Sequence, residues 1–345
     1  MHDWAKIEVL APNLKRRLSG VTATVLRLIP VQARRIGIVA TGPGLPAEVP
    51  QIALWRVFLA PRDRLRVWHA RRNNEMILGL ILRRLFRRRL KLLFTSAGQR
   101  RHTGLTQWLI AQQDGLIATS AKAASYLDRP AEVIRHGIDI DVFQPAADRV
   151  ALRRALGLPE TGVLIGCFGR IRAQKGVDLL VDAALELMPV RPGLSLVFAG
   201  RATAKHEAFL AAQQARIAAA GLSERIRFLG EVPWARLVEL HQALDLYVAP
   251  ARWEGFGLTP LEAMACGTPV VASDVGAHAE LVGPEQGTIV PPGEPAALTA
   301  ALAAWIDDPA RLAAARPGCR AHVAAAFPIG AEAERLNAVY RRLLA

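Results

Sequence analysis

Short apolar runs alternate with longer segments of helical periodicity along the first 120 residues. Runs of strand length occupy residues 6–10, 36–41, 65–69, 91–95 and 116–119. Segments compatible with helices lie between them, among them residues 21–31 and 73–89. Regular alternation of apolar strands with helices is typical of a parallel, doubly wound sheet. The pattern therefore predicts an α/β domain in this part of the chain.

The same alternation starts again after residue 150. Its strand-like runs lie at residues 163–168, 195–199, 226–228, 244–248, 270–272 and 288–290. Residues 130–145 begin and end with proline and read as a linker between the two series. The final segment, residues 327–345, has a helical pattern with apolar side chains on one face, namely Leu336, Val339, Tyr340 and Leu343. We therefore expect two Rossmann-like, doubly wound α/β domains.

Residues 249–275 are the most informative stretch of the chain. An apolar strand runs into a glycine-bearing loop, then a short helix that Gly267 and Pro269 end, then a second strand. The loop lies at the carboxyl end of a strand, where α/β proteins bind ligands. Gly255 and Gly257 allow the backbone to approach a ligand closely, and free amides at a helix start favour a phosphate.

Two carboxylates flank this loop. Glu254 precedes it, and Glu262 lies about one turn into the helix, where it is suited to accept hydrogen bonds from ribose hydroxyls. The spacing, followed by Ala-Cys-Gly-Thr-Pro-Val-Val-Ala, resembles the donor-site motif of retaining GT-B glycosyltransferases, family 4 in particular. The resemblance implies that Glu254 lies near the transferred sugar and that Glu262 binds the ribose. It assigns the diphosphate to the stretch Gly255, Phe256, Gly257, Leu258 and Thr259. An ordinary βαβ turn is the alternative.

A basic loop, Gly169 to Gly176, follows the strand-like run at residues 163–168. Fixed positive charge at the carboxyl end of a strand stabilises a departing diphosphate. The resemblance to family 4 assigns Arg170 and Lys175 to the β-phosphate of the donor, and places Gly169 in the donor site. A solvated basic loop without a ligand is the alternative.

Two further segments are similar to family 4 segments that contact the donor. Residues 228–233, with Glu231 and Val232, resemble the segment that lines the nucleobase pocket, although a strand ending in a glycine turn explains them without a ligand. In the first domain, Ser19 and Gly20 open a helix, and glycine amides there could meet the diphosphate or the acceptor. Family members often have two glycines at this place, so plain helix capping is the alternative.

Four residues of the first domain are candidate contacts for an acceptor. Many family 4 enzymes place a histidine where this chain has Ser96. His102 stands nearby at a helix start, and Arg100 and Arg101 could bind an acidic acceptor. His69, at the end of a strand, is a comparable candidate. The alternatives are a basic surface turn and a structural histidine.

The formal net charge of +14 is carried by one part of the chain. Residues 1–150 hold 25 basic and 11 acidic side chains, whereas residues 151–345 hold 19 of each. Such a basic field indicates a polyanionic partner: nucleic acid, an anionic membrane or a phosphorylated lipid. Residues 73–93 have the composition of a basic amphipathic helix on an anionic surface, although a Rossmann helix with a solvated face is the alternative. Their arginines are Arg83, Arg84, Arg87, Arg88 and Arg89.

Composition narrows the class of protein further. The chain has 345 residues and is 52% hydrophobic, which allows two ordinary cores and argues against disorder. Its three cysteines, Cys167, Cys266 and Cys319, fit no metal-binding spacing. The sequence has no apolar start of signal-peptide length and no apolar stretch of 18 residues. We therefore expect a cytoplasmic protein that does not span a membrane.

The first domain narrows the resemblance. Residues 67–75 and 93–97 look like those of bacterial lipopolysaccharide-core mannosyltransferases, which use GDP-mannose and a Kdo-lipid A acceptor. The resemblance implies a GT-B fold with two domains facing a cleft. Residues 1–137, completed by a helix at 327–345, are then the acceptor domain, and residues 138–326 bind the nucleotide sugar. It also implies front-face retaining transfer without a metal or other cofactor, by an enzyme peripheral to the inner membrane that contacts its anionic cytoplasmic leaflet.

Three other functions stay open. The chain could be a UDP-sugar-dependent transferase for another glycolipid or a polysaccharide, or a sugar-nucleotide epimerase of the same fold. From a different class, it could be a basic nucleic-acid-binding protein. That last function is disfavoured because the chain lacks an interleaved aromatic and basic platform, so we expect no nucleic-acid partner.

Overall fold

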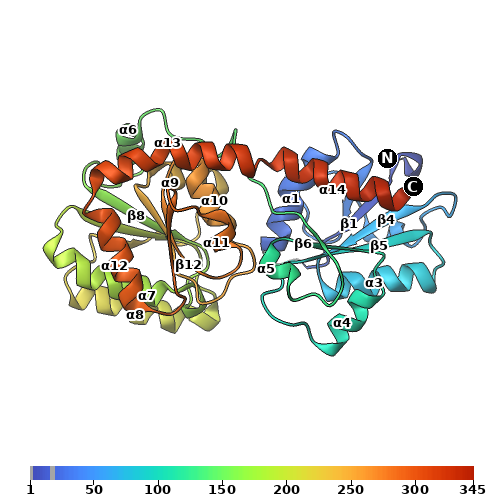
Figure 1. The fold of residues 1–345 in the computed structure, drawn as a ribbon, viewed down its shortest axis with the longest axis horizontal. Coiled ribbons are helices and arrows are strands. Elements are labelled where there is room, and N and C mark those ends of the chain that lie inside the picture. The colour runs from blue at the N-terminus through green and yellow to red at the C-terminus, as the bar shows by residue number, and fades with distance from the viewer. Residues whose placement is uncertain (1–2, 16–19) are drawn as a thin grey trace. The chain divides into compact units, whose positions relative to one another are not determined.

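The computed structural model describes residues 3–15 and 20–345, which form two compact units. The first unit comprises Met1–Gly137 and Ile329–Ala345, and the second comprises Ile138–Pro328. Each unit is a parallel sheet with helices on both faces (Figure 1). The prediction of two doubly wound α/β sheets is therefore confirmed.

The first sheet has seven parallel strands in the order β3-β2-β1-β4-β5-β6-β7. The strands are β1 Val9–Pro12, β2 Ile38–Thr41, β3 Gln51–Ile52, β4 Arg66–Ala70, β5 Leu90–Ser96, β6 Gly115–Ala118 and β7 Glu132–Val133. The helices are the 3-10 helix η1 Trp4–Lys6, then α1 Gly20–Gln32, α2 Leu54–Val57, α3 Asn73–Arg84, α4 Gly104–Ala111, α5 Ala121–Ala124 and α14 Ile329–Leu344. Every residue of β1, β2 and β4 is buried, as expected for central strands covered on both faces.

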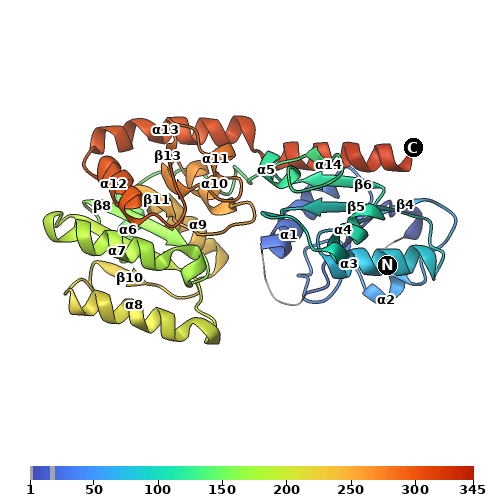
Figure 2. The same cartoon turned by 60° about the horizontal axis from the view of Figure 1, so that its bottom comes forward.

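The chain's last helix completes the core of the first unit. Helix α14 lies beside α1 (Figure 2). Its Leu336 and Tyr340 are buried in one apolar cluster with Val25 and Leu28 of α1. A second apolar cluster, which includes residues of α3 and α4, fills the other face of the sheet. Removing α14 would therefore expose apolar side chains of this cluster.

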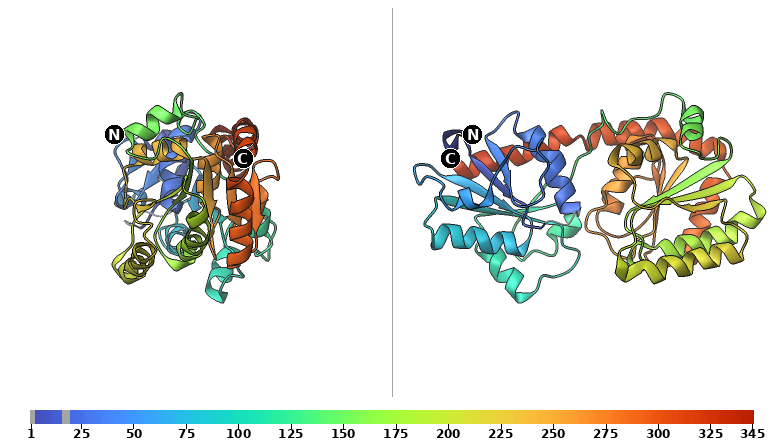
Figure 3. Two further views of the ribbon diagram at one scale, coloured as in Figure 1. Left: turned by 90° about the vertical axis from the view of Figure 1, so that its left-hand side faces the viewer. Right: turned by 180° about the vertical axis from the view of Figure 1, so that it is seen from behind.

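The second sheet has six parallel strands in the order β10-β9-β8-β11-β12-β13. The strands are β8 Val163–Phe168, β9 Leu194–Ala199, β10 Ile226–Phe228, β11 Leu246–Ala249, β12 Val270–Ser273 and β13 Gly287–Val290. The helices are α6 Arg149–Ala155, η2 Ala173–Lys175, α7 Val177–Leu187, η3 Met188–Val190, η4 Ala204–His206, α8 Glu207–Ala219, α9 Trp234–Ala243, α10 Leu258–Ala265, α11 His278–Leu281, α12 Pro295–Ile306 and α13 Pro309–Ala326. Helices α7, α8 and α12 lie on one face of this sheet, and α6, α9, α10 and α13 lie on the other (Figure 3).

Two predicted elements have different bounds in the structure. The strand expected at residues 6–10 lies at Val9–Pro12, because the η1 turn, capped by Asp3, occupies Trp4–Lys6. The helix expected over residues 73–89 ends at Arg84. Arg87 has a positive φ of 49°, and β5 begins three residues later. A continuous basic helix over residues 73–93 is therefore wrong.

The structure also shows the state of the cysteines and whether any helix could span a membrane. Cys167, Cys266 and Cys319 are buried and free, and burial raises the pKa of each thiol to about 12. Within residues 3–15 and 20–345, none of the helices has both the length and the apolar character needed to cross a bilayer.

Candidate active site

A pocket of about 360 Å³, including its open mouth, lies at the carboxyl ends of β8 and β11. These two strands are neighbours at the point where the strand order of the second sheet reverses. Doubly wound sheets bind their ligands at this switch point. The pocket is lined by Cys167, Phe168, Gly169, Arg170, Ile171, Lys175, Val177, Tyr247, Val248, Ala249, Pro250, Ala251, Glu254, Thr259 and His278.

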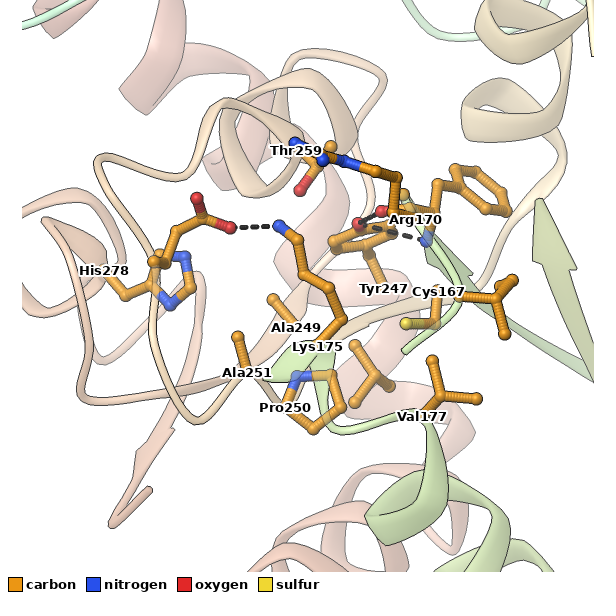
Figure 4. Close-up of a pocket in the computed structure, with 15 residues that line it drawn as sticks. Cys167, Arg170, Lys175, Val177, Tyr247, Ala249, Pro250, Ala251, Thr259 and His278 are labelled. Carbon is orange, nitrogen blue, oxygen red and sulfur yellow. Dashed lines mark hydrogen bonds and ion pairs between the residues drawn. The ribbon is translucent and has the colours of Figure 1, made fainter. Parts of the chain in front are cut away.

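An ion pair joins the two loops at this edge of the sheet. Nζ of Lys175 contacts Oε2 of Glu254, and Oε1 of Glu254 accepts a hydrogen bond of 3.0 Å from the amide of Gly255. Burial by itself would raise the pKa of Glu254, but the charge of Lys175 holds that pKa below its ordinary value. In Figure 4, Lys175 lies between His278 and Arg170. The pocket thus holds an ionised carboxylate that is paired with Lys175.

Gly176 fixes how closely the basic loop approaches the strand β11. It has a φ of +70°, and a Cβ there would lie 1.9 Å from the carbonyl oxygen of Pro250. Arg252 adds a bidentate ion pair to Asp178 at 2.7 and 2.8 Å, beside the η2 turn. These contacts hold Lys175 in place before any ligand binds, as a preorganised anion site requires.

The buried ring of His278 packs against Gly257 of the glycine loop. Its Nδ1 donates to the carbonyl of Ser273 at 2.9 Å, and burial lowers the pKa of its imidazole. Gly257, which caps α10, has a φ of +96°, and a Cβ there would lie 2.2 Å from Nε2 of His278. The pattern of glycines and glutamates did not reveal His278, although its place just after the strand β12 is a signal that could have done so.

Gly257→Ala should destabilise the protein and weaken binding of the nucleotide that the sequence predicts for this loop. The new methyl group would overlap the His278 ring, and the alanine would have to adopt a left-handed φ. Together these two effects should lower the free energy of unfolding by about 1–3 kcal/mol. Thermal unfolding and calorimetric titration with GDP measure both effects. Gly293→Ala is the matched control, since Gly293 has a φ of +81° with open space around it. If both variants lose the same stability and bind GDP equally, the contact with His278 has no role.

Glu262, the second predicted carboxylate, is buried beside the pocket. Glu262, on α10, is 8% exposed and does not line the pocket itself. Its Oε2 is 3.6 Å from Nε2 of the buried His241. Thr259, one turn earlier, reaches the pocket and bonds to the buried hydroxyl of Tyr247. α10 therefore presents a hydroxyl to the pocket and a carboxylate beside it.

The structure brings some of the predicted donor-site residues together and leaves others apart. Gly169, Arg170, Lys175, Glu254 and Thr259 line one pocket. Residues 255–257, in the loop between the last two of these, and Leu258, the first residue of α10, do not line it.

The predicted nucleobase segment lies outside this pocket. Val232 is half-buried, and the side chain of Glu231 is 64% exposed and faces Arg201 at 3.8 Å. Their contact with the base stays a prediction.

In the first unit, Gly20 is exposed as the first residue of α1, and a Cβ there would meet no atom of the described residues within 4 Å. Ser19 lies outside the described residues.

A polar network in the first unit joins three segments of the chain. Oδ1 of Asn13 accepts from Thr22 at 3.1 Å and from Arg72 at 3.0 Å. Arg72 also pairs with the buried Glu75 at 2.6 Å. This network had no signal in the sequence patterns, because its members come from three separate segments.

His69 lies in the interior. Its Nδ1 is 2.7 Å from the hydroxyl of Tyr340 on α14, and its Nε2 is 2.6 Å from Oγ1 of Thr95. Burial holds the pKa of His69 well below its ordinary value. The ring is 1% exposed and also lines a second cavity, of about 230 Å³, together with Arg71 and His136. His69 thus has a structural role, because its ring links β4 to α14 and β5. Its contact with an acceptor stays a prediction.

The remaining acceptor candidates follow β5. Arg100 and Arg101 are exposed, while His102 is half-buried with its Nε2 3.2 Å from Oγ of Ser96. Burial lowers the pKa of His102. The imidazole of His102 therefore lies beside Ser96, and its contact with an acceptor stays a prediction.

Comparison with known proteins places the chain among sugar-transferring enzymes. The family model described as glycosyl transferases group 1 matches residues 148–320. The chain is 49% identical to the lipopolysaccharide core biosynthesis mannosyltransferase LpsB of Rhizobium meliloti (strain 1021), over 100% of both chains. It is 51% identical to the lipopolysaccharide core biosynthesis mannosyltransferase LpcC of Rhizobium leguminosarum bv. viciae, over 100% of this chain and 99% of that one.

A solved structure gives the same result for the fold. Anabaena Alr3699/HepE in complex with UDP superposes with a TM-score of 0.85 at 20% identity, covering 97% of this chain and 100% of that one. At this identity the likeness concerns the fold, and it confirms the predicted GT-B class of two doubly wound sheets.

Proposed function

Because the chain belongs to the group 1 glycosyl transferases and is a glycosyltransferase, we propose that it moves mannose from GDP-mannose, with retention of configuration, to a Kdo-lipid A acceptor. The observation that carries the donor half of this proposal is the pocket in which Arg170, Lys175 and Glu254 meet at the switch point of the second sheet. The names of the two Rhizobium relatives support mannose and the lipopolysaccharide core.

The residues of the pocket suit the departure of a nucleoside diphosphate. Lys175 and Arg170 supply positive charge where the β-phosphate gains negative charge, and their loop is fixed before the ligand arrives. The amides at the start of α10 face the same edge of the sheet and add a favourable helix dipole. Glu254 is held ionised, so it can stabilise positive charge that develops on the sugar. The donor phosphate then takes the proton of the acceptor hydroxyl.

A panel of nucleotide sugars tests the proposal. Calorimetry with GDP-mannose, UDP-glucose and UDP-galactose should show tightest binding of GDP-mannose. Release of free GDP should require Kdo-lipid A, and the product should retain the anomeric configuration. Preference for a UDP-sugar would favour the alternative transferase, and conversion of the donor without acceptor would favour an epimerase. Salt-sensitive binding of DNA or RNA without any turnover would favour the nucleic-acid function.

The chemistry is proposed to need no metal. Turnover should stay within about twofold of its starting value after exhaustive treatment with EDTA, because Arg170 and Lys175 take the place that a divalent cation has in metal-dependent transferases. Steady-state rates before and after chelation measure this. A loss of activity that Mg²⁺ or Mn²⁺ restores would contradict it.

We also propose that the first unit contacts the anionic leaflet of the inner membrane through the ends of α2 and α3. The rings of Phe58 and Phe86 pack edge to face at 5.0 Å, and Arg62 donates to the carbonyl of Phe86 at 3.2 Å. Around this junction, large apolar side chains reach solvent, with exposures of 64% for Trp55, 65% for Leu59 and 74% for Leu85. We call these three residues with the exposed Arg84 and Arg87 the α2–α3 surface. Apolar and basic side chains side by side suit an anionic bilayer interface.

Arg84→Gln with Arg87→Gln should weaken binding to anionic vesicles by about tenfold or more, since each cation near the surface contributes about 1 kcal/mol. Arg88 is left in place because its guanidinium donates to the carbonyl of Ala60 at 2.6 Å, so its loss would disturb the fold. Co-sedimentation with vesicles of anionic and of neutral lipid measures the effect. Salt of about 0.5 M should release the parent protein from anionic vesicles.

The matched control is Arg34→Gln with Arg341→Gln, two exposed cations of the same unit, the first in the turn after α1 and the second on α14. It removes the same charge and should bind almost as the parent does. If the two double variants weaken binding equally, total charge attracts the membrane and the α2–α3 surface is not the contact.

A further inference from the structure

A buried histidine lies next to the carboxylate of Glu262. His241, on α9, is 0% exposed, and its Nε2 lies 3.6 Å from Oε2 of that carboxylate. Three aromatic rings surround the imidazole, with ring centres at 4.8 Å for Phe168, 5.3 Å for Tyr247 and 5.9 Å for Phe143. These rings leave the imidazole little freedom to turn away from Glu262.

The environment of His241 is unusual for a polar side chain. Among the residues that the structure describes, neither nitrogen of its ring has a hydrogen-bond partner. A buried donor without a partner carries its full desolvation cost, whereas an apolar side chain of similar size would fill the same space without it. Such a group in a folded protein calls for a specific explanation. The carboxylate of Glu262, 3.6 Å from Nε2, provides one.

We propose that His241 is a positioning residue of the donor site, whose Nε2–H donates a hydrogen bond to Glu262 when nucleotide is bound and keeps that carboxylate turned toward the ribose. The inference rests on the proposed function together with the assignment of the donor ribose to Glu262 that the family resemblance implies. A carboxylate accepts several hydrogen bonds, so His241 and the ribose hydroxyls can be served together. The separation has to close by only about half an ångström, and such contacts commonly tighten in the complex.

Nucleotides with and without ribose hydroxyls isolate this role. Calorimetry on the full chain compares whichever of GDP and UDP binds more tightly with its 2′,3′-dideoxy form. The parent protein should bind the dideoxy form about ten- to a hundredfold more weakly, because a hydrogen bond to a charged group is lost. Glu262→Ala should remove this difference. If the parent binds both forms equally, the assignment of the ribose to Glu262 is wrong, and this inference falls with it.

Variants of His241 then test the inference separately. His241→Phe should weaken binding of the ordinary nucleotide by about tenfold and leave the dideoxy form unchanged, whereas a purely structural role would weaken both equally. His241→Gln, which keeps an N–H donor, should recover most of the loss. His322→Gln is the control and should leave both affinities unchanged. His322 lies on α13 and bonds the carbonyl of Leu281 at 2.9 Å, so its partner in this contact is a backbone carbonyl and not Glu262. Full discrimination in folded His241→Phe would overturn the proposal.

A measurement on the parent protein keeps the test valid even where a variant does not fold. With ¹⁵N-labelled histidine, the Nε2 resonance of His241 should move on addition of the ordinary nucleotide and should move less with the dideoxy form. An Nε2 resonance that responds identically to the two nucleotides would show that no new hydrogen bond forms, and would equally overturn the proposal.

Discussion

Lys175→Ala and Arg170→Ala should each lower kcat by about two to three orders of magnitude. Both cations line the pocket at the switch point of the second sheet, and removing one charge from a preorganised anion site typically costs a few kcal/mol in the transition state. Lys175→Ala has a second consequence. Without its charge, burial should raise the pKa of Glu254, so part of that carboxylate becomes neutral near the sugar.

Steady-state turnover and thermal unfolding are measured together on both variants. Lys205→Ala and Arg154→Ala are matched controls, since Lys205 is exposed on the same unit and Arg154 is 69% exposed and paired with Glu160. They remove the same charges at a distance from the pocket and should keep normal rates. If Lys175→Ala and Arg170→Ala unfold normally and turn over at nearly the parent rate, the diphosphate assignment is wrong.

The sequence was informative where function depends on neighbours along the chain. A strand, a glycine loop and a helix predicted the place of Glu254, since loops at the carboxyl ends of parallel strands gather at one edge of a sheet. The same rule put Gly169 to Gly176 at that edge, and the structure has both loops in one pocket. Period and spacing suffice here because the local element fixes the direction of the side chain.

Contacts between distant segments could not be predicted in this way. His241 and Glu262 belong to different helices, and their meeting depends on how α9 and α10 pack on the sheet. His69 has the position of a site residue at the end of a strand, but α14, more than 250 residues later, covers it and binds its ring through Tyr340. Periodicity also missed the end of α3, because the bend at Arg87 has no glycine or proline to mark it.

Glu254→Gln and Glu262→Ala should separate catalysis from nucleotide binding. Glutamine keeps the size of Glu254 and an oxygen for the amide of Gly255, but it removes the charge that Lys175 now pairs with. We expect kcat to fall by about a hundredfold or more, with the Kd of GDP changed by no more than about threefold, because the lost interaction acts on the sugar in the transition state. Glu262→Ala should raise the Kd of GDP by about ten- to a hundredfold, because a charged acceptor for ribose hydroxyls is lost.

Calorimetry with GDP and initial rates at saturating donor give the two quantities for each variant. At saturation, Glu262→Ala should keep kcat within about tenfold of the parent, since ribose contacts act on the ground state and the transition state alike. Glu224→Ala, an exposed carboxylate of the same unit, should change neither value. Equal losses of GDP affinity in Glu254→Gln and Glu262→Ala would mean that both carboxylates serve the nucleotide, and the sugar would then have to be held by other residues of the pocket, with His278 the first to examine.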